Sequence, residues 1–495
     1  MSPAGPRKLV LAVIDGMKPS SLERAMQTGR APVLRAMAER GTYVPECAAL
    51  FPSVTPVCAT AIATGVRQDR HHIPGMNWYW REAGRYVEYG SSFSASRRFG
   101  FARQLNDTIY NLNGEHLPPE VLTVFEQLDD GGIRTAGTTY LVIRGRHEHQ
   151  VARDSPLSRL AATVIRKPVM GPKELFYADI FASQETGCTA TLGLPGRRDQ
   201  HSGCVGAHLV ANDLCDFMLL SLPDNDTHSH EHGPDAQVAS IADADRQLER
   251  LAHAAGGIEP FLDTHAVIAV ADHSHAPVDR TIDLEPAIRE RFHVLEPSGR
   301  GGDDAELALC PSQRSAQLYA LVEEGRDELV PRMVEAALEV DGVELACHRG
   351  RDGDGVISRA GGGVLTFAPG TSVRDARGER WRVHGDLEVL GAQLDGEDLV
   401  APEYPDALAR VWAALTCPTS GDVVLSAAPG AEFPDWGGQD HVGGGSHGSL
   451  HAVDSLGALV FSGVGAPTDR SADGAWSIID VAPMAVAHFL GGSGD

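Results

Sequence analysis

The chain has 495 residues, 42% of them hydrophobic and 22% charged, so it can bury a large core and is not expected to be disordered. The formal net charge of −25 argues against nucleic acid polymers as ligands, because proteins that bind the phosphate backbone carry a basic surface. No segment approaches the roughly 20 apolar residues of a membrane span, and no signal peptide is visible, which predicts a cytoplasmic protein.

Apolar runs of strand length alternate with helical patterns along the chain. The first run, KLVLAVI at residues 8–14, suits a strand that is buried on both faces of a parallel sheet. Further runs of this kind occupy residues 216–222, 265–271, 422–427 and 457–462. Helical patterns occupy residues 21–40, 118–129, 235–255 and 478–490. The alternation predicts an α/β domain with a doubly wound, mostly parallel sheet flanked by helices.

Two stretches interrupt this alternation, and we interpret both as inserted cap regions. Residues 146–204 are loop-like and rich in Gly, Pro and Arg, whereas residues 296–416 mix short strands with Gly-rich and Asp-rich turns. The second stretch is expected to form another cap or a small α+β insertion. The remaining residues, 1–145, 205–295 and 417–495, are then predicted to form the catalytic core.

The eight cysteines are scattered and include no CxxC pair. This pattern favours reduced, mostly structural thiols over a disulfide framework or a zinc knuckle. A bridge between Cys188 and Cys204 is the less favoured alternative.

Polar residues follow the predicted elements at five places. They are Asp15, Thr55 in FPSVTP, Asp226 and His230 in PDNDTHSHEHGP, Asp272–His273, and His447 in GGGSHGS. Ligands of doubly wound folds bind at the carboxyl ends of the strands, so these side chains are expected to converge. Their carboxylates and imidazoles are donors that zinc prefers. Two ions roughly 4 Å apart can hold both the attacking and the leaving oxygen of a phosphoryl transfer.

Five motifs follow one another along the chain: VIDGMKP, FPSVTP followed by ATG, D-x-x-x-H-x-x-G-P, ADH and GSHG. In this order they resemble the motifs of the type I phosphodiesterase and nucleotide pyrophosphatase family of the alkaline phosphatase superfamily. The terminal WSIIDVAPMAVAHFLGG is similar to the last helix of that family. The resemblance spans residues 8–490 but does not explain the two insertions. It implies an alkaline-phosphatase-like fold.

The resemblance also implies two zinc ions, with other divalent metals as an alternative. One ion would be bound by Asp226, His230 and His447, and the other by Asp15, Asp272, His273 and the Thr55 oxygen. Thr55 would be the nucleophile and would form a phosphothreonine, because a metal-bound hydroxyl loses its proton more readily. Asn77 in GMNWYW falls about where the family places an asparagine that donates to a phosphate oxygen.

Several of these residues have competing interpretations. Thr55 precedes a proline, so it could serve only as a helix N-cap. Asp224 and His228 have the same spacing as Asp226 and His230, but Gly233 and Pro234 follow the second pair in the family register. Structural or surface roles are predicted for His71, His72, His275 and His451, and packing is preferred for the aromatic residues beside Asn77.

The predicted function is hydrolysis of a phosphodiester or pyrophosphate bond in a small-molecule phosphate ester. A phosphomonoesterase or a phosphonate hydrolase of the same superfamily is the main alternative. A catalytically silent binding protein on this fold is disfavoured by the complete set of metal ligands. The sequence does not specify an oligomeric state.

Overall fold

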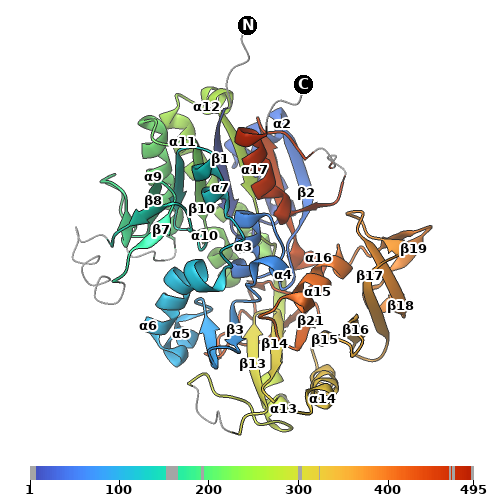
Figure 1. Cartoon of the computed structure of the whole chain (residues 1–495). Coiled ribbons are helices and arrows are strands. Elements are labelled where there is room, and N and C mark those ends of the chain that lie inside the picture. The colour runs from blue at the N-terminus through green and yellow to red at the C-terminus, as the bar shows by residue number, and fades with distance from the viewer. Residues whose placement is uncertain are drawn as a thin grey trace.

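A computed structural model describes residues 7–151, 166–190, 194, 196–298, 304–322, 324–467, 470 and 474–491. Two nine-stranded sheets organise the chain, and Figure 1 shows the second of them, in yellow and orange, beside and below the first. Among the described residues, no helix combines the length and the apolar character needed to cross a membrane.

The central sheet has the strand order β25-β2-β24-β11-β1-β10-β5-β8-β9. Its middle strand β1 (Lys8–Ile14) pairs in parallel with β10 (Phe217–Leu222) and β11 (His265–Val270). The other strands are β2 (Thr42–Ala48), β5 (Thr135–Thr138), β8 (Glu174–Tyr177), β9 (Phe181–Ala182), β24 (Leu456–Ser462) and β25 (Trp476–Ser477). Antiparallel pairs join β24 to β11 and β2, and β9 to β8. The predicted mostly parallel sheet is therefore confirmed.

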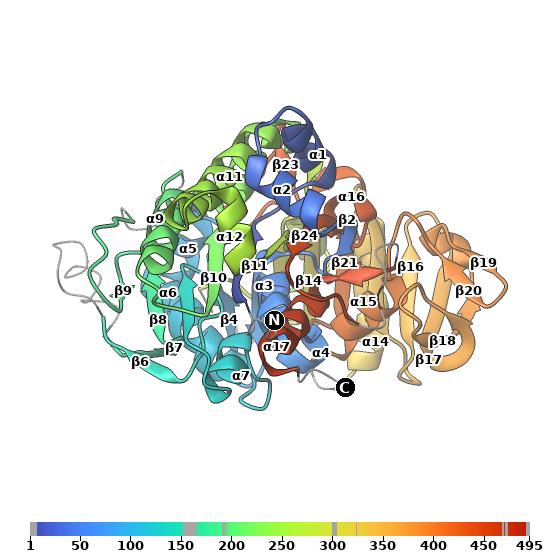
Figure 2. The ribbon, with the colours of Figure 1, turned by 90° about the horizontal axis from the view of Figure 1, so that it is seen from above.

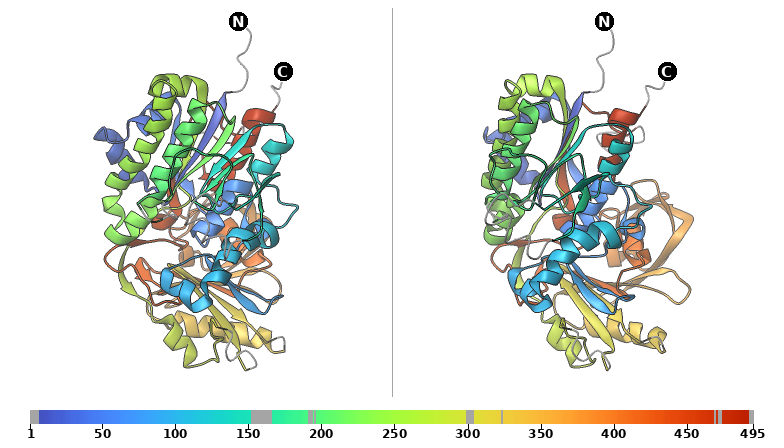
Figure 3. Two further views of the ribbon diagram at one scale, coloured as in Figure 1. Left: turned by 90° about the vertical axis from the view of Figure 1, so that its left-hand side faces the viewer. Right: turned by 60° about the vertical axis from the view of Figure 1, so that its left-hand side comes forward.

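Helices cover both faces of the central sheet, as Figures 2 and 3 show. Side chains alternate along β1: Val10, Ala12 and Ile14 pack with one helical layer, and the intervening residues pack with the other. The first layer contains α1 (Pro19–Gln27), α2 (Pro32–Arg40), α9 (Arg198–Ala211), α11 (Gln237–Ala254) and α12 (Ile258–Thr264). The second contains α3 (Thr55–Thr64), α7 (Val124–Asp130) and α17 (Val481–Leu490). Burial on both faces explains why β1 is continuously apolar.

The second sheet has the order β13-β14-β21-β15-β16-β17-β20-β19, with β18 also paired to β17. Its strands are β13 (Leu307–Ser312), β14 (Ser315–Ala320), β15 (Val343–Arg349), β16 (Gly355–Arg359), β17 (Val364–Arg374), β18 (Arg380–Gly385), β19 (Gln393–Asp395), β20 (Asp398–Val400) and β21 (Val423–Ala427). Helices α14 (Arg326–Leu338) and α15 (Ala407–Thr416) contact it. Strand β21 was expected in the central sheet. Its apolar run predicts a buried strand but does not specify which sheet that strand joins.

Smaller elements complete the described fold. One small sheet contains β12 (Ala276–Thr281), β22 (Gly430–Glu432) and β23 (Gly445–Ser446). Two further antiparallel pairs are formed by β3 (Asn77–Trp80) with β4 (Arg85–Glu88) and by β6 (His147–His149) with β7 (Val169–Gly171). The remaining helices are α4 (Gln68–His71), α5 (Phe93–Phe99), α6 (Phe101–Asn106), α10 (Asp224–His232), α13 (Leu284–Arg289), α16 (Ala452–Ser455), a π-helix at Asp107–His116 and 3₁₀ turns at Pro234–Ala236, Leu387–Leu390 and Ile478–Asp480.

Two predicted helices differ from the structure because proline interrupts them. The helix expected at residues 21–40 is divided into α1 and α2, since Pro32 begins the second helix. The helix expected at residues 118–129 begins only at Val124, after Pro118 and Pro119. Proline lacks the N–H that would continue a helix through these positions.

The described residues of the segment 146–204 include regular elements that its composition did not predict. Its strands β8 and β9 extend the central sheet, and α9 continues through the predicted boundary at residue 204. Cys188 and Cys204 form a disulfide, so the prediction of reduced thiols is wrong for this pair. The other six cysteines are free and buried, as predicted. Disulfides are typical of oxidising compartments, and the cytoplasmic location therefore stays a prediction.

Candidate active site

The predicted metal ligands meet at the carboxyl end of the central sheet. Asp15 follows the last residue of β1, and Asp272 lies two residues beyond β11. Helix α10 begins two residues after β10 and carries Asp226 and His230. Because β11, β1 and β10 are adjacent and parallel, their carboxyl ends lie at one edge and bring these side chains together.

A first cluster surrounds the Nε2 atom of His273. The Oγ1 atom of Thr55, the Oδ1 atom of Asp15 and the Oδ2 atom of Asp272 each lie 3.4 Å from this nitrogen. Ligands of a tetrahedral zinc ion with bonds of about 2.0–2.1 Å are about 3.3 Å apart. Asp15 Oδ1 is also buried, and no described residue offers it a hydrogen bond. The donors and their spacing therefore fit a zinc ion.

A second cluster surrounds the Oδ1 atom of Asp226. The Nε2 atoms of His230 and His447 lie 3.3 Å and 3.4 Å from this oxygen, which again is the spacing of ligands around one ion. The ring of His447 stacks on that of His273 with 3.5 Å between centroids. The two clusters are therefore adjacent, and the structure brings together all seven metal ligands predicted from the sequence.

Backbone carbonyls orient the three histidines that were predicted to bind metal. The Nδ1 atoms lie 2.7 Å from Gly445 O in His230, 3.1 Å from Ser274 O in His273 and 2.8 Å from Ser53 O in His447. A carbonyl only accepts hydrogen bonds, so Nδ1 of each ring carries the proton. The lone pair of each Nε2 atom then faces the cluster, as metal ligation requires.

Burial disfavours the ionised form of each carboxylate in this site. Burial, with Asp272 and Asp226 nearby, holds the pKa of Asp15 well above its usual value. Burial also raises the pKa of Asp272 to about 6. Burial alone would raise the pKa of Asp226 too, but His230 and the neighbouring imidazoles hold it well below the usual range. A bound cation would favour the ionised form of all three carboxylates.

Thr55 is the first residue of α3 and does not cap it. The N-cap is Val54, and no side chain caps the helix. The interpretation of Thr55 as only a helix cap is therefore wrong, because its hydroxyl faces His273 instead. Every later residue of α3 is buried, and Gly65 ends the helix with a φ of 74°. The amino end of α3 thus lies at the His273 cluster, where its free N–H groups favour an anion.

Asn77 lies in β3 and its predicted contact with phosphate stays a prediction. Its Nδ2 atom donates to the carbonyl of Pro311 at 2.6 Å, and its Oδ1 atom is buried without a hydrogen-bond partner in the described part of the chain. The neighbouring Trp78 is buried and packs edge-on against His116, in agreement with the preferred packing role.

Three further side chains reach the Asp226 cluster without having been predicted. His275, which was expected to be structural or surface-exposed, places Nε2 2.9 Å from Asp226 Oδ1. Gln313, from the β13–β14 turn, places its amide nitrogen 3.3 Å from His230 Nε2. His441 stacks on His230 with 3.9 Å between centroids. Only His275 had a signal in the sequence, its position two residues after His273.

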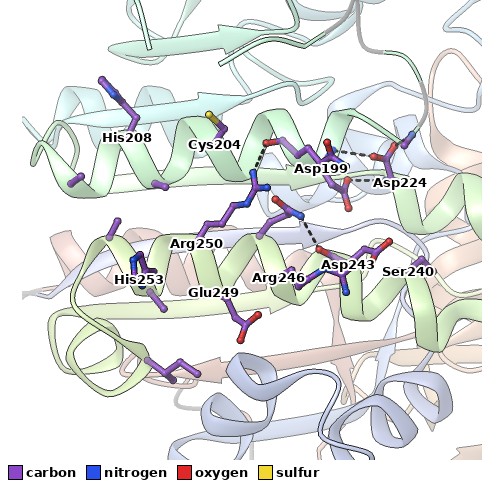
Figure 4. A pocket seen from close by; sticks show the side chains of 18 of the residues that line it. Asp199, Cys204, His208, Asp224, Ser240, Asp243, Arg246, Glu249, Arg250 and His253 are labelled. Atoms are coloured by element: carbon purple, nitrogen blue, oxygen red, sulfur yellow. Dashed lines mark hydrogen bonds and ion pairs between the residues drawn. The ribbon is translucent and has the colours of Figure 1, made fainter. Parts of the chain in front are cut away.

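Helix α10 is anchored by a reciprocal pair of caps with α9, shown in Figure 4. The backbone N–H of Asp224 donates to Asp199 Oδ1 at 3.0 Å, and the N–H of Asp199 donates to Asp224 Oδ2 at 3.1 Å. Arg198 also donates to Asp224. Asp224 of the alternative ligand pair Asp224 and His228 is therefore held against α9. These two residues line a cavity of about 1260 Å³ between α9 and α11, which none of the seven predicted metal ligands lines.

The paired caps make the stability of the protein depend on pH. Burial and the neighbouring Asp224 raise the pKa of Asp199 to about 8, so the folded state holds a proton that the unfolded chain releases near pH 4. Stability is therefore lost as pH rises from about 4 to 8. Asp199→Asn should remove this loss, so its free energy of unfolding should exceed that of the wild type by on the order of 5 kcal/mol at pH 8.5, but not at pH 4.5.

Thermal denaturation of both proteins at the two pH values tests this expectation. Asp243→Asn on the exposed side of α11 is the matched control and should show no such pH dependence. If the difference in stability between Asp199→Asn and the wild type were equal at both pH values, Asp199 would be ionised in the folded protein at both, which would contradict this expectation.

Comparison with solved structures shows the same fold in other proteins. The chain is similar to phosphonoacetate hydrolase from Sinorhizobium meliloti, with 17% identity, a TM-score of 0.56, and coverage of 98% of this chain and 96% of that one. It is similar to human ectonucleotide pyrophosphatase/phosphodiesterase 5 at 13% identity, and to an inactive Thr-to-Ala variant of the murine protein in complex with AMP at 12%. Both have TM-scores of 0.57 and coverage of 98% of this chain and 95% of theirs. No curated protein sequence matches significantly.

These similarities confirm the predicted alkaline-phosphatase-like fold. The sequence profile of the family described as type I phosphodiesterase/nucleotide pyrophosphatase matches residues 9–450, from β1 to just beyond His447. That match includes both clusters of candidate metal ligands and both predicted insertions. The chain belongs to the type I phosphodiesterase/nucleotide pyrophosphatase family.

Proposed function

We propose that the protein is a two-zinc hydrolase that cleaves a phosphodiester or pyrophosphate bond through a phosphothreonine at Thr55. The observation that carries this proposal is the position of the Thr55 hydroxyl. It lies 3.4 Å from the same imidazole nitrogen of His273 that Asp15 and Asp272 approach. A hydroxyl among carboxylate and imidazole donors is suited to nucleophilic attack rather than to structural capping.

The donor set indicates which residues would hold the two ions. Asp15, Asp272, His273 and Thr55 would hold one, and Asp226, His230 and His447 the other. Bound zinc supplies Lewis-acid chemistry here, because it lowers the pKa of a hydroxyl and offsets charge on phosphoryl oxygens. The carbonyls behind the three imidazoles keep their lone pairs directed inward.

The reaction would proceed in two displacements at phosphorus. Thr55 Oγ1 loses its proton to solvent and forms a bond to phosphorus, while the bond to the leaving alcohol or phosphate breaks. Water then attacks the phosphothreonine, breaks the bond between Oγ1 and phosphorus, and restores the hydroxyl. The amino end of α3 would place backbone N–H groups beside the phosphoryl oxygens in both steps.

The structural neighbours support two substrate classes. The murine neighbour binds AMP as an inactive Thr-to-Ala variant, which agrees with an essential threonine in a nucleotide-directed site. The similarity to phosphonoacetate hydrolase keeps a phosphonate substrate as the second candidate. The family assignment favours the first class.

A substrate panel distinguishes these candidates and the phosphomonoesterase. The panel contains bis-p-nitrophenyl phosphate, a dinucleotide pyrophosphate, p-nitrophenyl phosphate and phosphonoacetate, each assayed with wild type and with Thr55→Ala. We expect kcat/KM to be at least about 10-fold higher for the diester or pyrophosphate, which corresponds to about 1.4 kcal/mol of transition-state binding. Faster turnover of the monoester would contradict the proposed substrate class and indicate a phosphomonoesterase. Faster turnover of phosphonoacetate would contradict it in favour of a phosphonate hydrolase.

A further inference from the structure

We propose that His275 is a positioning residue for the metal ligand Asp226. In this assignment, the Nε2–H group of His275 donates to the Asp226 carboxylate and holds its oxygen toward the ion shared with His230 and His447. The inference deepens the proposed function and rests on the metal site that it includes. It gives a role to a histidine that belongs to neither predicted ligand set.

Distances separate His275 from the histidines that were predicted to bind metal. His230 Nε2 and His447 Nε2 lie 3.3 Å and 3.4 Å from Asp226 Oδ1, as expected of ligands with an ion between them. His275 Nε2 lies 2.9 Å from the same oxygen. That value is within the range of a charge-assisted N–H···O hydrogen bond.

The second nitrogen of the ring leads to the same assignment. In His230, His273 and His447 the Nδ1 atom meets a backbone carbonyl, which leaves the Nε2 lone pair for a metal. His275 Nδ1 is buried and has no hydrogen-bond partner among the residues that the structure describes. A neutral ring therefore keeps its proton on Nε2, where the carboxylate accepts it, and His275 has no lone pair there to give to an ion.

Packing fixes His275 in this position. Its side chain is fully buried, and its carbonyl accepts a hydrogen bond from Lys18 Nζ at 3.1 Å. The ring lies directly over Gly16, where a Cβ atom would approach its Nε2 and Cδ2 atoms to 2.6 Å. Gly16 follows the ligand Asp15 and has a φ of 66°, so glycine is favoured there for both space and conformation. A side chain at residue 16 would therefore displace the ring of His275.

The expected consequence is a selective loss of metal affinity. Removal of a hydrogen bond to a metal-binding carboxylate typically weakens metal binding by about 10–100-fold. Only the ion held by Asp226 should be affected, because His275 has no polar contact with Asp15 or Asp272 among the hydrogen bonds of the described chain. The ion beside Thr55 should bind as in the wild type.

Zinc affinity of the metal-free full chain, measured by competition with a chromophoric chelator, tests the proposal. His275→Met and His275→Leu remove the donor, whereas His275→Gln retains an N–H group at about the same distance from the backbone. His253→Met, an exposed position on α11, is the control. The melting temperature of each metal-free protein shows which variants are folded. Zinc affinity is then compared for whichever of the Met and Leu variants has the melting temperature of the wild type.

The proposal expects the Met or Leu variant to lose about 10–100-fold in affinity at one of two sites, and the Gln variant to stay within a few-fold of wild type. Equal losses in the Gln and the Met or Leu variants would overturn it, since a ligand role or simple packing would explain them. Unchanged affinity in all variants would also overturn it. Absence of zinc binding by the wild type would instead contradict the proposed function itself.

Discussion

Replacement of Thr55 by alanine should lower kcat by about 10⁴-fold or more while leaving the fold intact. The loss is expected because the hydroxyl beside His273 is the only nucleophile that the protein itself supplies in the proposed mechanism. Stability should change little, since Thr55 caps no helix end and its side chain makes no backbone hydrogen bond within the described chain. Steady-state kinetics and thermal melting of the purified variant measure the two effects.

Two matched variants make this result interpretable. Thr55→Ser keeps a hydroxyl and should retain measurable turnover, whereas Thr28→Ala, at an exposed position beyond α1, should match the wild type. Retention of more than about a tenth of wild-type kcat by Thr55→Ala would exclude Thr55 as the nucleophile, because loss of a nucleophile costs several orders of magnitude.

Removal of metal should abolish turnover and destabilise the protein. The buried carboxylates of Asp15 and Asp272 and the half-buried carboxylate of Asp226 then lack the cation that would offset their charge. Zinc present at about 100–1000 times its dissociation constant should contribute about 2.7–4.1 kcal/mol to stability. Activity and Tm are measured after dialysis against a chelator and again after zinc is restored.

The recovery should also depend on pH. Zinc must displace the proton of Asp272, whose pKa is raised to about 6 in the metal-free site, so affinity should fall as pH decreases below that value. Full activity after complete removal of metal, verified by elemental analysis, would contradict a zinc-dependent mechanism. Recovery with another divalent ion alone would change only the identity of the metal.

The sequence was most informative where a short segment specifies its own position. The apolar run at β1, followed directly by Asp15, predicts both a buried strand and a polar residue at its carboxyl end. The same reasoning applies to β10 and to β11, which deliver Asp226 and Asp272. For this reason the ligands predicted from five separate motifs meet in the structure.

Contacts between distant segments could not be predicted in this way. Strand β21 is a buried run like β1, yet its partners β14 and β15 are distant in the chain. Gln313 reaches His230 only because the β13–β14 turn packs against α10, the helix that carries Asp226 and His230. The Cys188–Cys204 disulfide likewise depends on α9 lying beside a loop whose position composition does not encode. Tertiary packing decides each of these contacts.

The stereochemical course at phosphorus tests the central claim most directly. A chiral phosphorothioate diester is hydrolysed in ¹⁸O-labelled water by the wild-type enzyme loaded with zinc, and the configuration of the product is determined. Attack by Thr55 followed by attack of water inverts the configuration twice, so the proposed mechanism predicts net retention. Net inversion would show a single displacement by water and would contradict the assignment of Thr55 as the nucleophile.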